Sequence, residues 1–241
     1  MNDSEKIEIS VVVPVYNEEE NLPILIPKLV EVLKGLGLPY EMIFVDDGSS
    51  DGSRRILKEM ASLHPSLRMV GFKENRGLSA ALVAGMREAR GQKIVTLDSD
   101  LQNDPADIPK LLEYLNQYDM ATGWRQKRED PWLKRISSKI ANAIRNQLSG
   151  EEIQDSACTL RAFKKECIQD IWVFNGMHRF LSTLVKMQGY RIIEVPVTHH
   201  PRRFGKSKYN MRNRMVRSLL DLLAVKWMKR RRIDYDIEER V

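Results

Sequence analysis

Residues 7–15 read IEISVVVPV, a nearly continuous β-branched run that decides the fold class of the chain. A strand with one wet face would alternate apolar and polar residues, and this stretch has too few polar breaks for that. It therefore predicts a strand that is buried on both faces, as in a parallel sheet covered by helices. Apolar residues then recur at helical spacing over residues 19–34, which predicts a helix packed on that strand.

The same alternation continues outward from this first unit. Strands are expected at residues 41–45, 67–72 and 93–97. A helix is expected between the first two of them, capped within residues 50–53 and running to about residue 63, and another at 77–90. This β-α-β-α order predicts an α/β fold with a doubly wound, mainly parallel, Rossmann-like sheet, whose ligands bind at the carboxyl ends of the strands. Beyond it we expect helices at 109–117, 131–148, 179–188 and 210–232, and strands at 120–123, 158–163 and 191–197.

Composition excludes several classes of protein. The 241 residues are 42% hydrophobic and 30% charged, so a disordered or fibrous chain is excluded and one compact body is expected. Every apolar run is shorter than the ~20 residues that span a bilayer, so we expect no transmembrane helix. The two cysteines, Cys158 and Cys167, are expected to be free thiols in a reducing cytoplasm, with Cys158 buried rather than nucleophilic.

The net charge of +6 is unevenly distributed. Residues 202–232 hold twelve Lys or Arg and one acid, whereas residues 233–241 carry a net charge of −3 and the rest of the chain carries −2. A basic segment of this kind binds phosphate, whether in a nucleic acid, an anionic membrane surface or a phosphorylated substrate.

Two acidic clusters, Asp46-Asp47 and Asp98-Ser99-Asp100, follow predicted strands. Carboxylates there cost desolvation energy unless a partner such as a divalent cation neutralises them. Gln102 continues the same face with a neutral oxygen. On spacing alone a capped turn before Pro105 is the favoured alternative, since Asp is common in such turns.

The segment Pro14-Val15-Tyr16-Asn17-Glu18 lies where the first strand ends. Tyr16 is suited to stacking on a base, and Glu18 to accepting a hydrogen bond from a ribose or base. A helix-capping turn with a packed tyrosine is an equal alternative.

Five segments together carry a resemblance: VVVPVYNEEENL (11–22), VDDGSSDGS (45–53), ENRGLSAALVAGM (74–86), LDSDLQNDP (97–105) and RFGKSKY (203–209). In this order and spacing they resemble the inverting nucleotide-sugar glycosyltransferases of the GT-A fold. The nearest branch is that of the polyprenyl-phosphate transferases, which are dolichol-phosphate mannose synthase-like. The resemblance covers roughly residues 7–229 and implies the doubly wound sheet expected above.

The resemblance implies a role for each candidate residue. The nucleotide would be held by Pro14, Tyr16, Glu18, Asp46, Asp47 and Ser99. Mg²⁺ or Mn²⁺ would be bound by Asp98, Asp100 and Gln102, and the catalytic acids would be Asp98, Asp100 and, with a looser motif match, Asp155. The acceptor phosphate would be bound by Arg125, Lys134, Arg135, Ser138, Arg203 and Lys208. Arg202 and Lys206 are expected to be solvated surface charges.

The resulting hypothesis is metal-dependent inverting transfer of a sugar from a nucleotide-sugar to a polyprenyl phosphate. The resemblance to the family favours mannose as the sugar and GDP-mannose as its donor. A hydroxyl acceptor needs a general base, for which Asp155 is the candidate, whereas a lipid phosphate is already ionised. Transfer to a hydroxyl is therefore the alternative enzyme. A basic protein that binds nucleic acid or a membrane surface without catalysis is the alternative of another class, although the sequence contains no groove-reading motif and no nucleic-acid partner is expected.

The expected division is a GT-A catalytic domain at residues 1–209, followed by a basic amphipathic helix and an acidic tail at 210–241. Within the domain, residues 1–123 would form the nucleotide-sugar half and 124–209 the acceptor half. One broad apolar arc is expected on the final helix, containing Leu220, Leu222, Leu223 and Trp227 among others. That arc would pack on the body, lie on an anionic membrane surface at the cytoplasmic face, or bind a small membrane subunit.

Overall fold

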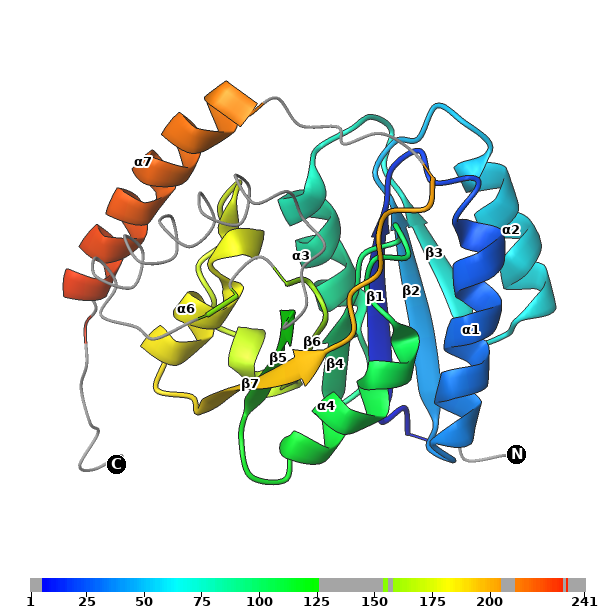
Figure 1. The fold of residues 1–241 in the computed structure, drawn as a ribbon, viewed down its shortest axis with the longest axis horizontal. Helices are drawn as coiled ribbons and strands as arrows, with labels where there is room; N and C mark the ends of the chain where they lie inside the picture. Colours follow the sequence, from blue (N-terminus) through cyan, green and yellow to red (C-terminus); the bar gives the residue numbers. More distant parts are fainter. Residues whose placement is uncertain (1–5, 126–153, 156–157, 205–210, 232, 234–241) are drawn as a thin grey trace, which may run out of the picture.

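The computed structural model describes residues 6–125, 154–155, 158–204, 211–231 and 233. Its centre is a seven-stranded sheet in the order β3-β2-β1-β4-β6-β5-β7, with helices on both faces (Figure 1). This is the α/β fold with a mainly parallel sheet that the sequence predicts. The expected helix at residues 131–148 lies outside the described residues.

The strands lie close to their predicted positions. They are β1 (Ile9–Val15), β2 (Tyr40–Asp46), β3 (Leu67–Gly71), β4 (Lys93–Thr96), β5 (Met120–Arg125), β6 (Arg161–Lys164) and β7 (Ile192–Val197). The α-helices are α1 (Leu22–Gly35), α2 (Ser53–Leu63), α3 (Leu78–Glu88), α4 (Ile108–Tyr114), α6 (Leu181–Met187) and α7 (Met211–Arg230). Short 3₁₀ helices occur at Pro105–Asp107, Lys165–Ile168 and Met177–Arg179.

Strand pairing gives the sheet two parts. β1 pairs in parallel with both β2 and β4, and β2 with β3, so these four strands end at one edge. β6 is inserted antiparallel between β4 and β5, while β7 pairs in parallel with β5. The second part therefore joins the first in one continuous sheet, and β6 starts beside the end of β4.

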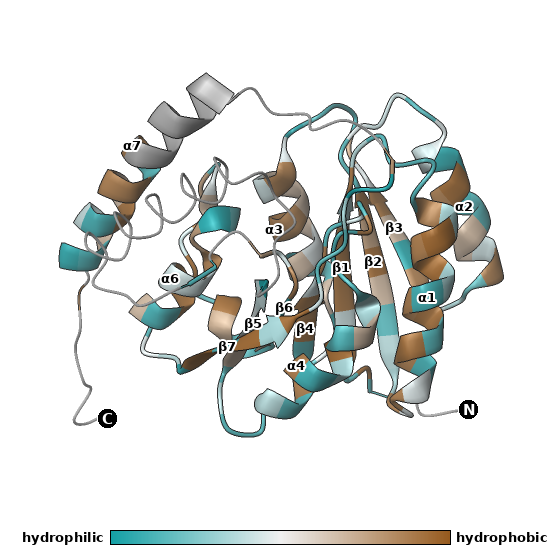
Figure 2. Ribbon diagram, in the orientation of Figure 1, coloured by the Kyte–Doolittle hydropathy of each residue, from teal (hydrophilic) through white to brown (hydrophobic). Residues whose placement is uncertain are grey.

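The buried run of β1 divides the core, because successive side chains point to opposite faces of the sheet. Val11 and Val13 pack with α1, α2 and α4, whereas Val12 packs with α3, α6 and α7. Figure 2 shows strands rich in apolar residues at the centre, flanked by helices that carry both apolar and polar residues. All seven residues of β1 are buried, as its lack of alternation predicts.

A buried carboxylate ties the elements together at the amino end of the sheet. One Glu41 oxygen accepts hydrogen bonds from Ser10 Oγ (2.8 Å) and Arg90 N (2.7 Å), and the other pairs with Arg68 Nη1 at 2.8 Å. Arg68 also pairs with Glu88 at 2.8 Å. Burial alone would raise the pKa of Glu41, but these partners outweigh it and hold the pKa below its ordinary value of 4.5.

We expect Glu41→Gln to lower the free energy of unfolding by about 1–3 kcal/mol at pH 7, because it weakens the charged bonds of a buried group. A depressed pKa stabilises the fold above the ordinary pKa and loses this contribution as pH falls through the folded value. The difference between wild type and variant should therefore shrink below about pH 4.5. Urea unfolding at pH 7 and at acid pH measures both; an unchanged difference in acid would contradict the assignment.

Candidate active site

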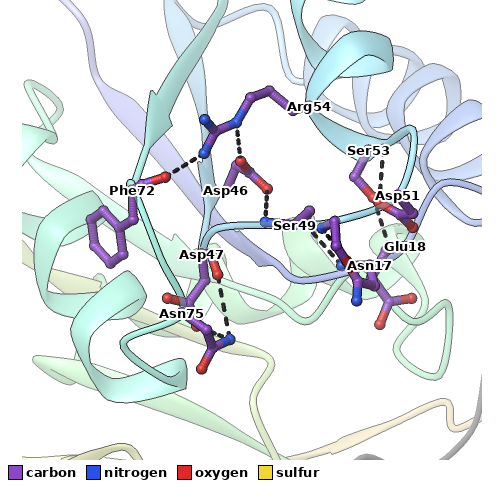
Figure 3. Close-up of polar contacts among 11 residues, drawn as sticks. Asn17, Glu18, Asp46, Asp47, Ser49, Asp51, Ser53, Arg54, Phe72 and Asn75 are labelled. Atoms are coloured by element: carbon purple, nitrogen blue, oxygen red, sulfur yellow. Dashed lines mark hydrogen bonds and ion pairs between the residues drawn. The ribbon is translucent and has the colours of Figure 1, made fainter.

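The loop after β1 is tied to the loop between β2 and α2 (Figure 3). Asn17 has a positive φ of 53°, and its amide N donates to Ser49 Oγ at 2.9 Å while its Oδ1 accepts from Ser50 N at 2.8 Å. Glu18 N donates to Ser53 Oγ at 2.8 Å, and Glu18 Oε2 accepts from Asn21 Nδ2 at 2.5 Å. These bonds fix Glu18, and with it the half-buried Tyr16, at the carboxyl edge of the sheet.

Asp46 and Asp47 have different partners, although both are almost fully buried. Asp46 pairs with Arg54 Nε at 2.6 Å and accepts from Ser49 N at 3.1 Å. Asp47 accepts from the backbone N–H groups of residues 76 (2.6 Å) and 77 (2.9 Å), at the start of α3, and from Asn75 Nδ2 at 3.0 Å. Burial raises the pKa of Asp47 despite these bonds. Both carboxylates thus hold the loops in place, and their contact with a nucleotide stays a prediction.

The second acidic cluster lies just beyond β4, next to the end of β1. Ser99 Oγ donates to the carbonyl oxygen of Pro14 at 2.9 Å, which joins two of the predicted nucleotide-binding segments. Burial, reinforced by the negative charge of Asp100, raises the pKa of Asp98 to about 7. Asp100 Oδ2 accepts from Arg202 Nη2 at 2.6 Å. Two carboxylates therefore lie close together at the end of β4, and one of them is balanced by an arginine that a cation could replace.

The chain after β7 runs beside this cluster and explains how Arg202 reaches it. Thr198 N donates to Asp107 Oδ2 at 2.7 Å, and His200 N donates to the carbonyl oxygen of Gln102 at 2.8 Å. The Gln102 amide nitrogen lies 3.5 Å from His199 Nε2. These contacts along residues 102–107 position Arg202 next to Asp100. The expectation that Arg202 is a solvated surface charge is therefore wrong.

A fully buried arginine lies behind the acids. Arg161, the first residue of β6, is 1% exposed, and burial lowers its pKa. Its charge interacts with the carboxylates of Asp98 and Asp155. Because β6 pairs antiparallel with β4, its first residue lies where β4 ends, at Thr96. The buried guanidinium therefore supplies positive charge to both acids.

Asp155 and Arg125 form a bidentate ion pair. Arg125 Nε and Nη2 lie 2.6 and 2.8 Å from the two Asp155 oxygens, and Asp155 is 2% exposed. From the sequence, Asp155 is expected to be a catalytic acid and Arg125 a separate ligand of the acceptor phosphate. The structure instead pairs them, with Asp155 further held by its N–H bond to Glu194 Oε1 (2.9 Å).

The remaining candidates are only partly placed. Arg203 is exposed next to Arg202. Lys134, Arg135, Ser138 and Lys208 lie outside the described residues. Cys158 is 1% exposed, and burial raises its pKa to about 11, which confirms the prediction of a buried, unreactive thiol.

The two arginines that balance the acids, Arg161 and Arg202, are not among the site residues expected from the sequence. Arg161 had one available signal: a charged residue opening an otherwise apolar strand must meet opposite charge if that strand is buried. Arg202 had none, because its contact depends on how residues 198–202 lie against residues 100–107. No three His, Cys, Asp or Glu side chains in the described ranges form a group suited to a metal ion.

Comparison with known proteins agrees with this fold. The sequence profile described as Glycosyl transferase family 2 matches residues 10–172. The chain belongs to this family, and is thus a glycosyltransferase of the GT-A fold.

Two curated relatives are named undecaprenyl-phosphate 4-deoxy-4-formamido-L-arabinose transferase. The protein from Proteus mirabilis is 37% identical over 227 residues, covering 93% of this chain and 69% of the relative. The one from Edwardsiella ictaluri is also 37% identical, over 228 residues, with 93% and 70% covered. These relatives place the chain beside the polyprenyl-phosphate branch.

Solved structures share the fold at low sequence identity. Glucosyl-3-phosphoglycerate synthase from Mycobacterium tuberculosis, in complex with Mn²⁺, UDP and phosphoglyceric acid, has a TM-score of 0.69 at 19% identity, covering 95% of this chain and 80% of that one. A mannosyltransferase from Pyrobaculum calidifontis, in complex with GDP-Man and Mn²⁺, has a TM-score of 0.60 at 23% identity, covering 92% and 64%.

The Arg125–Asp155 pair predicts a specific pattern of stability. Arg125→Gln should lower the free energy of unfolding by about 3–5 kcal/mol, because it leaves the buried Asp155 charge without its bidentate partner. The double variant Arg125→Gln, Asp155→Asn should recover part of that loss, because no buried charge then remains at that position. Urea unfolding of the two variants measures this; a double variant no more stable than Arg125→Gln would contradict the pairing.

Proposed function

We propose that this glycosyltransferase moves a sugar from a nucleotide-sugar to a polyprenyl phosphate. The observation that carries the proposal is the acidic cluster of Asp98 and Asp100 at the end of β4, faced by Arg202 from the segment after β7. This ion pair supports a site in which the segment proposed to bind the donor lies next to the residue that precedes Arg203, a proposed acceptor ligand. The names of the 37%-identical relatives support undecaprenyl phosphate as the lipid.

The identity of the sugar is the finer part of the proposal. The family resemblance favours mannose from GDP-mannose, and the structural neighbour with bound GDP-Man is 23% identical. The more similar relatives are named for 4-deoxy-4-formamido-L-arabinose. We therefore take nucleotide-activated 4-deoxy-4-formamido-L-arabinose as the first donor to test and GDP-mannose as the second.

The residues present fit a divalent cation. Two neighbouring carboxylates, one with its pKa raised to about 7 and the other paired with an arginine, form a site that attracts positive charge. Asp98 and Asp100 would hold Mg²⁺ or Mn²⁺, with Gln102 as a further oxygen ligand and the donor diphosphate completing the shell. When bound, the metal would neutralise charge on the departing nucleoside diphosphate.

The pairing of Asp155 favours a phosphate acceptor over a hydroxyl. A general base must have a carboxylate oxygen available to the proton that it removes. Both Asp155 oxygens accept hydrogen bonds from Arg125, so both are already engaged in the ion pair. A lipid phosphate needs no base, because it is already an oxyanion at neutral pH.

The chain's residues have distinct tasks in the proposed step. The segment around Tyr16 and Glu18 holds the nucleoside at the end of β1. An acceptor phosphate oxygen attacks the anomeric carbon in line, forming one C–O bond while the bond to the nucleoside diphosphate breaks. The acceptor phosphate is oriented by charge-assisted bonds from basic side chains. These are Arg202 and Arg203, together with Lys134, Arg135 and Lys208, which are proposed from the sequence. The product is a sugar joined to the lipid phosphate with inverted configuration.

A transfer assay tests the proposal. Purified protein, Mg²⁺ or Mn²⁺ and undecaprenyl phosphate in detergent are mixed with each labelled donor, and lipid-extractable label is counted. We expect metal-dependent product, and a loss of about a hundredfold or more with Asp100→Asn. Glu59→Gln, an exposed acid on α2, is the matched control and should retain activity. Product that forms equally without lipid phosphate, on a sugar hydroxyl, would support the alternative acceptor.

Arg202 should compete with the metal for Asp100. Removing its positive charge should tighten Mn²⁺ binding in the absence of substrates by about two- to fivefold, the scale of a partly exposed ion pair. Arg203→Ala removes the same charge from its exposed neighbour and serves as the control. Mn²⁺ titration followed by electron paramagnetic resonance measures both affinities without requiring turnover. Equal affinities for the Arg202→Ala and Arg203→Ala variants would contradict the competition.

A further inference from the structure

Helix α7 has two apolar sides, of which only one is covered by the body. Leu222, Val225 and Met228 are buried in the core that also contains α3 and α6. Leu220, Leu223 and Trp227 are 60%, 49% and 59% exposed. Spaced at i, i+3 and i+7, these three form one stripe on the side of the helix that faces away from the core. The single apolar arc expected from the sequence is therefore wrong, because Leu222 lies on the inner side.

Basic residues border this outward stripe. Lys226, Arg230 and Arg231 fall on the same half of the helical wheel as Leu223 and Trp227, with Arg230 and Arg231 exposed. The acid of this helix, Asp221, pairs with Arg179 Nη2 at 2.6 Å, so its charge is already balanced. The outward side of α7 thus combines large apolar residues with positive charge.

A second exposed apolar pair is anchored to the same helix. Trp172 and Val173 are 53% and 50% exposed in the loop before the 3₁₀ helix at Met177–Arg179. That loop is held against α7, because Arg179 pairs with Asp221 and a side-chain carbon at Gly176 would lie 2.5 Å from an Asp221 oxygen. The loop that carries Trp172 and Val173 is therefore adjacent to α7.

Helix α7 is connected to the proposed site. α7 starts nine residues after Arg202, a length of chain that spans at most ~30 Å. Figure 1 shows α7 along one flank, with its first turn toward the edge at which β1 and β2 end. A surface that met this flank would lie beside the segment that carries Arg202 and Arg203.

We propose that the outward stripe of α7, with the Trp172–Val173 loop, docks on an anionic lipid bilayer. Exposed Trp and Leu flanked by Lys and Arg suit the boundary between headgroups and acyl chains, and each basic residue near an anionic surface contributes ~1 kcal/mol. The biological role of this docking rests on the proposed lipid acceptor. The exposed apolar and basic residues that would make the contact do not depend on that proposal. Of the helices in the described part of the chain, none is both long and apolar enough to cross a membrane.

Vesicle flotation tests the docking without donor, acceptor or metal. Vesicles of phosphatidylcholine with phosphatidylglycerol, or of phosphatidylcholine alone, are mixed with the full chain. We expect flotation with the anionic vesicles, reduced about tenfold or more on phosphatidylcholine alone. The variant Leu220→Gln, Leu223→Gln, Trp227→Gln should lose binding to a similar extent. Its side chains are exposed, so thermal unfolding should stay close to that of wild type.

Leu63→Gln is the matched control, since Leu63 is 69% exposed on α2, on the opposite face of the sheet. A wild-type chain that does not float with anionic vesicles, or a triple variant that floats as well as wild type, would overturn the proposal and favour a protein partner for this stripe. Transfer in detergent is measured in parallel. Retained detergent activity without flotation rejects the docking surface alone, whereas flotation without transfer rejects the proposed function alone.

Discussion

The structure depends on neutralising carboxylates at the edge of a buried parallel sheet. β1, β2 and β4 are apolar and end together, so the acids that follow them are drawn out of water and need compensation. Each acid finds a different partner: Asp46 takes Arg54, Asp47 takes the backbone at the start of α3, and Asp100 takes Arg202. These pairings also set the positions of the surrounding loops. The same charges therefore hold in place the edge of the sheet at which a ligand is proposed to bind.

The fold was predictable from the sequence because its signals are local. The unbroken apolar run of β1 and the helical spacing after it specify a buried strand and its covering helix, and the pattern repeats through β4. The insertion of β6 antiparallel between β4 and β5 could not be predicted, since strand order is set by packing between distant segments. The candidate site shows the same contrast between local signals and contacts between distant segments. The positions of Tyr16, Glu18, Asp98 and Asp100 at strand ends follow from local pattern, whereas the Arg125–Asp155 and Arg202–Asp100 pairs join residues 30 and 102 positions apart.

Helix α7 shows why a helical wheel alone is an incomplete guide. The sequence places many apolar residues on this helix, and the wheel groups several of them on one arc. In the structure the body covers Leu222, Val225 and Met228, and this contact determines which side remains outside. The ion pair of Asp221 with Arg179 reinforces the same orientation, because it fixes the rotation of the helix about its axis. The set of α7 residues that stays exposed is thus determined by the packing and the ion pair on the side of the helix that faces the body.

Charge balance links the two halves of the proposed reaction. The acids Asp98, Asp100 and Asp155 lie near Arg125, Arg161 and Arg202, so the substrate-free cluster is close to neutral. A donor diphosphate and a lipid phosphate would add several negative charges to this neutral cluster, and at short range in a partly desolvated site their repulsion is large. Added positive charge must therefore accompany the substrates, which is the physical reason to expect a divalent cation at Asp98 and Asp100. It also gives the paired arginines a role, because a cation that takes over Asp100 leaves Arg202 with a full positive charge beside the incoming phosphate. Binding of the donor with its cation would then favour binding of the acceptor phosphate, and the reverse, because both depend on whether Asp100 is paired with Arg202.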